Sequence, residues 1–135
     1  MNTDTAVIFH CFETLAESDN DITEAVYKNY TSSMPSVKQH IGYLDNSMKG
    51  RMLDQVYRLL LGEADEHYLR FEVHTHNDYG ATVALYKGLL TAIKKAVKDS
   101  LGTVWTTKEE KSWNASIKRI LVDIEKIIVS APKDS

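Results

Sequence analysis

The sequence has few residues that could cross-link or interrupt the chain. Among its 135 residues are one cysteine, Cys11, and two prolines, Pro35 and Pro132. A single cysteine cannot form an intramolecular disulfide, and a free thiol is typical of a reducing compartment. Low-complexity tracts and internal repeats are missing as well, so the spacing of apolar residues can be followed along most of the chain.

Long apolar runs and an excess of one charge are also missing. No stretch approaches the roughly 20 apolar residues that a membrane-spanning helix needs, and His10 interrupts the apolar start, unlike a signal peptide. The formal net charge is -3, and the 16 basic residues are scattered, which argues against nucleic acid as a partner. The length suits one core. We therefore expect a single cytoplasmic domain over residues 1–135, with neither nucleic acid nor membrane as a partner.

What is present is helical periodicity. Thr106 and Glu109 have the spacing of a capping box, which predicts the start of a long final helix. The apolar residues that follow at helical spacing are Trp113, Ile117, Ile120, Leu121, Ile124, Ile127 and Ile128. A second stripe runs from Tyr86 through Leu89, Leu90 and Ile93 to Val97 and stops near Gly102. These patterns predict two neighbouring amphipathic helices at the end of the chain.

The first half of the chain has the same character. A helix is predicted between Asp45 and Gly62, and another begins near Asp21 and ends before Pro35. In the latter helix, the residues expected to point inward are Ile22, Ala25, Val26 and Tyr30. Residues 6–15 would suit a strand or a helix, and helix is favoured because no partner strand is predicted anywhere. The sequence therefore predicts a compact all-α domain of six or seven helices.

Three segments at the predicted joints resemble the haem domain of flavohaemoglobins and bacterial single-domain globins. In "YKNYTSSMPSVKQHI", residues 27–41, Tyr27 lies eight residues before Pro35, as in the globin B-to-C segment. In "HNDYGATVALYKGLL", residues 76–90, a histidine is followed by glycine at +4 and tyrosine at +10, as around the iron-binding histidine. "LGTVWTTKEEKSW", residues 101–113, is similar to the G–H corner. The resemblance covers nearly the whole chain.

The resemblance implies a globin-like fold with a haem b pocket between the E and F helices. Its metal ligand would be His76, which binds the haem iron through one ring nitrogen. Leu69 and Val73 fall on the same helix face as His76. His74 lies roughly 200° around that helix, at about 100° per residue, so both histidines cannot reach one iron. Tyr86 matches the tyrosine that supports the proximal histidine in flavohaemoglobins, although its glutamate partner is replaced here by Ile128.

The resemblance also assigns a distal side. Met48 lies 28 residues before His76, close to the usual separation of the distal and proximal positions, and Lys49 is the alternative. The residues expected to roof the haem are Met48, Met52, Leu53, Val56 and Leu59. Tyr27 would donate a hydrogen bond to the bound gas, and Arg51 would pair with a haem propionate. Ile41 stands where globins generally place a phenylalanine against the haem.

The function implied is reversible binding of O₂, NO or CO at a histidine-ligated iron, in a monomer or a homodimer. Conversion of NO to nitrate would need an external reductase, because the chain has no room for a flavin or nicotinamide domain. A second hypothesis is a globin fold used as a haem-free interaction module, since fold alone does not decide function. A third is a zinc or nickel site formed by His67, His74 and His76, which lacks a cysteine or carboxylate to complete it.

Overall fold

The computed structural model describes residues 2–42, 44–63, 70 and 82–130. Within these ranges the chain is helical and contains no strand, which confirms the all-α prediction there, including a helix rather than a strand over residues 6–15. The α-helices are α1 (Thr3–Glu17), α2 (Thr23–Ser33), α3 (Lys38–Ile41), α4 (Asn46–Leu60), α6 (Val83–Leu101) and α7 (Thr107–Ser130). Two short 3₁₀ turns, η1 (Pro35–Val37) and η2 (Gly102–Val104), precede α3 and α7.

Helices α4, α6 and α7 have ends that lie where the local sequence predicts. At the start of α4, the Asp45 carboxylate accepts a hydrogen bond from the Met48 N–H at 2.8 Å. Before α7, the Glu109 carboxylate accepts from the Thr106 N–H at 2.7 Å, which completes the predicted capping box. Gly62 and Gly102 follow α4 and α6 with φ values of +71° and +56°, a conformation that favours glycine.

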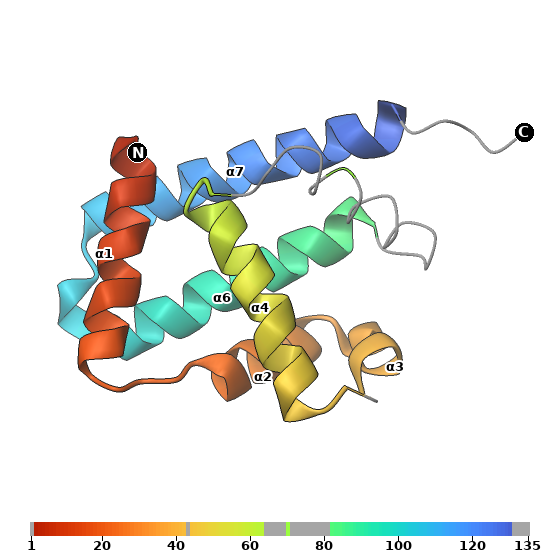
Figure 1. Cartoon of the computed structure of the whole chain (residues 1–135), viewed down its shortest axis with the longest axis horizontal. Helices are drawn as coiled ribbons and strands as arrows, with labels where there is room; N and C mark the ends of the chain where they lie inside the picture. The colour runs from red at the N-terminus through yellow and green to blue at the C-terminus, as the bar shows by residue number, and fades with distance from the viewer. Residues whose placement is uncertain (1, 43, 64–69, 71–81, 131–135) are drawn as a thin grey trace, which may run out of the picture.

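The helices pack in pairs around one core (Figure 1). Helix α1 crosses α7, α2 packs on α6, and α6 and α7 lie side by side in opposite directions. Helix α4 contacts α2 and α7. Trp113 lies at the centre, fully buried, with the Phe12 ring 5.8 Å from it. The Phe12 ring also lies 4.8 Å from Tyr57, so aromatic contacts join α1, α4 and α7.

Most of the predicted apolar stripes point inward. On α7 the residues of the stripe are buried except for Leu121 and Ile128, which are half-buried, and on α6 Leu90, Ile93 and Val97 are buried. The prediction for Ala25 is wrong, because this residue is exposed and Tyr27 is buried instead. At 3.6 residues per turn, Ala25 and Tyr27 lie on nearly opposite sides of α2, so only one of them can face the core.

Candidate functional site

Helix α4 carries two apolar stripes. Leu53 and Leu60 are fully buried in the core, and Tyr57 lies on the same side against Phe12. The second stripe, here called the open stripe, consists of Met48, Met52, Val56 and Leu59. The last three are half-buried, and Met48 is 43% exposed. Of the five predicted roof residues, Leu53 therefore belongs to the core, and the other four form an apolar face that the protein covers only in part.

Helices α6 and α7 also have large apolar side chains that are only partly covered. They are Leu85, Tyr86 and Leu89 on α6, and Leu121 and Ile128 on α7. Because these two helices run in opposite directions, the start of α6 and the end of α7 lie at the same end of the molecule (Figure 1). Tyr86 and Ile128 belong to that end. Partly covered apolar surface therefore occurs on α4, α6 and α7. His76 lies in the segment of the sequence between α4 and α6.

Tyr27 is buried on α2, and its hydroxyl donates a hydrogen bond to the backbone carbonyl of Lys49 at 3.0 Å. The Lys49 Nζ lies 5.3 Å from the centre of the Tyr27 ring. Burial and the neighbouring Tyr30 raise the pKa of Tyr27 to about 12, so the phenol keeps its proton. Since a phenol has one proton to donate, Tyr27 can donate to a bound gas only by releasing the Lys49 carbonyl.

Three of the predicted site residues, one of them Tyr27, come together in the structure. Tyr27, Ile41 and Lys49 line a hollow of about 310 Å³ between α2, α3 and α4. Ile41 is buried at the end of α3. Arg51 is exposed, and its guanidinium donates to the Ser47 hydroxyl at 3.2 Å on the same helix. The structure therefore brings Tyr27, Ile41 and Lys49 together, whereas Arg51 does not line this hollow.

The interhelical contact of Tyr30 was not predicted from the sequence. The buried Tyr30 hydroxyl donates to the Leu85 carbonyl at 2.9 Å, and this bond joins α2 to the first turn of α6. The two residues are 55 positions apart. The tyrosine that follows Tyr27 by three residues could have indicated a second polar contact on this side of α2, because a buried hydroxyl needs a partner.

The proposed metal ligands lie outside the described residues. This applies to His76 and to His67 and His74 of the three-histidine hypothesis, and also to Leu69 and Val73, which were predicted to share a helix face with His76. Within the described ranges, no three His, Cys, Asp or Glu side chains gather into a possible metal site. Cys11 is buried, and that burial raises the pKa of its thiol, which disfavours the thiolate that binds metals.

Comparison with protein-family models and with curated protein sequences finds no match for this chain. None of the helices in the described ranges combines the length and the apolar character needed to cross a lipid bilayer. The features that bear on function are therefore the open stripe, the half-buried apolar residues of α6 and α7, and the residues around Tyr27.

Proposed function

We propose that this protein is a haem-binding globin that reversibly binds a diatomic gas, O₂ or NO. The observation that carries the proposal is the open stripe of α4. Four apolar side chains, Met48, Met52, Val56 and Leu59, follow one another along one face of α4, where Met52, Val56 and Leu59 pack against the core but stay partly exposed. Large apolar side chains left partly exposed in this way mark a ligand or partner surface.

The dimensions and chemistry of the open stripe suit a porphyrin. From residue 48 to residue 59 a helix advances roughly 16 Å, at 1.5 Å per residue. Cofactor pockets are lined mainly by apolar side chains, with few polar groups that fix orientation. Methionine, valine and leucine provide such a wall, and their neutral side chains offer no nitrogen that competes for iron. The exposed Arg51, on the same helix, is free of any acidic partner in the described residues and suits a propionate at the rim.

The arrangement of helices supports the same proposal. Globins pack their helices pairwise at steep angles around a haem pocket, unlike the nearly parallel helices of a bundle. Here α1 crosses α7 and α4 lies at a steep angle to α6 in Figure 1. By resemblance, α4 corresponds to the E helix and α6 to the G helix, and the segment between them carries His76. That segment would complete the pocket opposite the open stripe.

Each residue has a defined task in this proposal. His76 would hold the iron through one neutral imidazole nitrogen. The haem, when bound, supplies the iron at which the gas binds. The open stripe would exclude water from the side of the haem that it covers. Tyr27, on the neighbouring helix α2, would supply a hydroxyl group. Its hydrogen bond to the Lys49 carbonyl keeps the phenol in place until a better acceptor competes for the proton.

The decisive experiment is an absorption spectrum of the purified protein titrated with hemin. We expect a Soret band with saturation at one haem per chain. His76→Ala should lose the band or release haem readily to a scavenging apoprotein, whereas the matched variant His74→Ala should retain it. The reverse pattern would move the iron ligand two residues along the chain, to His74. No specific haem uptake by the wild-type protein would reject the proposal and leave the haem-free interaction module.

A further inference from the structure

Three lysines from three helices line the hollow beside Tyr27. Lys28 belongs to α2, Lys38 to α3 and Lys49 to α4. Helices α2 and α3 and the start of α4 meet at one end of the molecule (Figure 1). Within the described residues, none of the three lysines forms an ion pair. Ammonium groups that gather without acidic partners create a positive potential, which attracts an anion. The space that these lysines line is here called the lysine hollow.

The remaining lining of the lysine hollow combines apolar surface with polar side chains. Ile41 and Tyr27 are buried, and the Tyr27 hydroxyl already donates to the Lys49 carbonyl at 3.0 Å, so its ring is the part that a ligand can contact. The Thr31 hydroxyl donates to the Tyr27 carbonyl at 2.9 Å and can still accept a further hydrogen bond. The other polar residues of the lining are Thr23, Glu24 and Asn46.

The acidic residues near the lysine hollow leave its lining positive. Glu24 is the one carboxylate among the described lining residues, so three lysines face one acid. Asp21 and Asp45 precede α2 and α4 and are not part of the lining. Asp21 accepts a hydrogen bond from the Thr23 N–H at 2.9 Å, and Asp45 accepts one from the Met48 N–H at 2.8 Å. These two carboxylates therefore cap their own helices, and the lining itself carries two more positive than negative charges.

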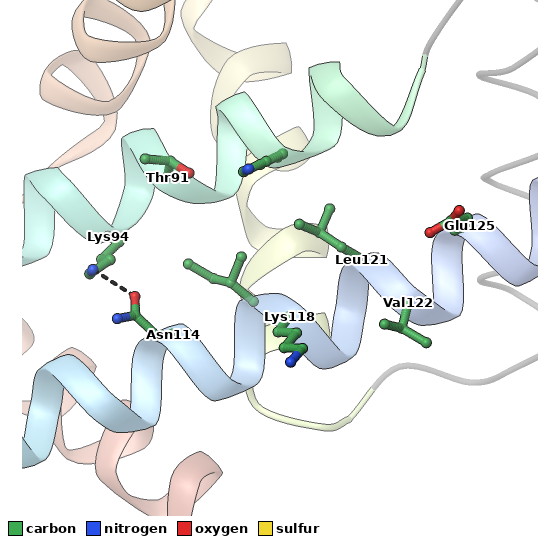
Figure 2. A pocket seen from close by; sticks show the side chains of 9 residues that line it. Thr91, Lys94, Asn114, Lys118, Leu121, Val122 and Glu125 are labelled. Carbon is green, nitrogen blue, oxygen red and sulfur yellow. Dashed lines mark hydrogen bonds between the residues drawn. The ribbon is translucent and has the colours of Figure 1, made fainter.

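The groove between α6 and α7 provides a contrast. It has a volume of about 380 Å³ and is also lined by three lysines, one of which is Lys94. Figure 2 shows the bond from Lys94 to Asn114, which is 2.7 Å long, and Lys94 also pairs with Glu110. Glu125 is a further acid in that lining. The protein itself thus neutralises part of this groove, whereas the lysines of the lysine hollow have no such partner in the described residues.

We propose that the lysine hollow binds a small sugar phosphate through its phosphate group. A phosphate monoester carries a charge of about −1.5 to −2 at pH 7 and three acceptor oxygens, which matches the excess charge of the lining. Ammonium groups bind phosphate as point charges, whereas planar carboxylates favour the guanidinium fork of arginine. No arginine occurs among the described lining residues.

The size and polarity of the lysine hollow suit the sugar as well as the phosphate. Its volume of about 310 Å³ lies at the lower end of the roughly 300–1,000 Å³ found for small-molecule sites. Sugar hydroxyls would bond to Glu24, Thr31 and Asn46, and a less polar face of the ring would lie against Tyr27. A nucleic acid fits less well, because the lysines surround one hollow and the net charge of the chain is -3.

This site is separate from the proposed haem pocket. The residues of the open stripe, Met48, Met52, Val56 and Leu59, do not line the lysine hollow. Sugar phosphate binding can therefore be measured on the full chain without added haem, and its result does not depend on haem uptake.

Isothermal titration calorimetry at low ionic strength, where lysine charges are least screened, tests the proposal. We expect glucose 6-phosphate to bind at one site per chain, with a dissociation constant on the order of 0.1 to 1 mM. Glucose, which lacks the charge, should not bind in this range, and inorganic phosphate, which lacks the sugar contacts, should bind more weakly. Vesicles that contain phosphatidic acid test whether a lipid headgroup is the source of the phosphate instead.

Substitutions in the lining test the role of its charges. Lys28→Gln and Lys38→Gln should each weaken binding by about three-fold to ten-fold, and Lys28→Arg should retain most of it, because the charge remains. Glu24→Gln should strengthen binding by about two-fold to five-fold, because it removes the carboxylate that repels the phosphate. The matched control is Lys111→Gln, the same change at an exposed position of α7 outside the lysine hollow. Circular dichroism verifies that each variant keeps its helix content.

Binding of glucose 6-phosphate that both lysine substitutions weaken, that Glu24→Gln strengthens and that Lys111→Gln leaves unchanged supports the site. A wild-type chain that binds no glucose 6-phosphate up to about ten times the expected constant overturns the proposal, and so does binding to the vesicles alone. Equal weakening by Lys111→Gln would show an effect of net charge only. Binding of glucose or of inorganic phosphate as tight as that of glucose 6-phosphate would reject a sugar phosphate as the ligand.

Discussion

Two tyrosines of this protein bury their hydroxyl groups with opposite consequences. The Tyr27 hydroxyl donates to the Lys49 carbonyl, whereas the Tyr57 hydroxyl is buried with no hydrogen-bond partner in the described residues. A satisfied buried hydroxyl stabilises a fold by about 0.5–1.5 kcal/mol, and an unsatisfied one costs its desolvation. Tyr27→Phe should therefore lower the free energy of unfolding by about 1 kcal/mol, and Tyr57→Phe should leave it unchanged or raise it. Urea denaturation of both variants measures the contrast.

Each of these two variants is the control for the other, because both substitutions remove one hydroxyl oxygen from a largely buried ring. Equal losses of stability would contradict the contrast and indicate that Tyr57 also has a partner. The sequence indicated that Tyr27 was important through its spacing to Pro35. It could not indicate the partner, because Lys49 lies 22 residues away and meets Tyr27 only when α4 packs on α2.

At the scale of elements, one acidic residue of α7, Glu110, forms ion pairs with two lysines of α6. The Glu110 carboxylate pairs with Lys94 and Lys98 of α6 and accepts from the Trp105 indole at 3.2 Å. Hydrogen bonds from Lys94 and then Lys98 lower the pKa of Glu110 from 4.5 to about 2. A carboxyl whose pKa is lowered on folding adds stability above its unfolded pKa, and this stability is lost as the pH falls through the folded value.

The resulting prediction concerns acid unfolding. Between pH 5 and about 2, the wild-type melting temperature should fall more steeply than that of Glu110→Gln, because only the wild type must protonate this carboxylate. Above pH 5 the wild type should be the more stable of the two. Melting curves followed by circular dichroism at closely spaced pH values measure the difference. Parallel curves for the two proteins would show that the α6–α7 contact does not depend on the charge of Glu110.

The boundaries of the helices could be predicted because their causes are local. Asp45, Glu109, Gly62 and Gly102 act on backbone groups within a few residues of themselves. The division of α4 into two apolar stripes could not be predicted in the same way. Leu53 and Met52 are neighbours of similar hydrophobicity, and only the position of α4 against α7 and α2 decides that Leu53 enters the core.

At the scale of the whole molecule, the core and the proposed pocket are built from different faces of the same helices. The core faces meet around the fully buried Trp113. The half-buried residues of the open stripe, of α6 and of α7 pack against that core and keep part of their surface exposed. The protein can therefore fold around Trp113 and still gain stability when an apolar ligand covers the remaining faces, since a ligand that binds only the folded state stabilises it.

Hemin should therefore raise the stability of the wild-type protein by an amount that depends on the open stripe. At a free concentration about 100 times the dissociation constant, the gain is about 2.7 kcal/mol. Val56→Asp places a charge on the open stripe, and burial of an unpaired charge against a porphyrin is costly. We expect this variant to lose most of the gain. Arg58→Asp, at an exposed position of the same helix, should keep it.

Thermal denaturation without hemin gives the intrinsic stability of each variant, and the same measurement with hemin gives the gain from binding. A loss of intrinsic stability is thereby separated from a loss of haem binding. If Val56→Asp unfolds earlier without hemin yet keeps the full gain, the haem does not cover the open stripe. If Arg58→Asp loses the gain as well, the effect reflects the charge of α4 rather than its apolar face. Only a selective loss in Val56→Asp places the porphyrin against Met52, Val56 and Leu59.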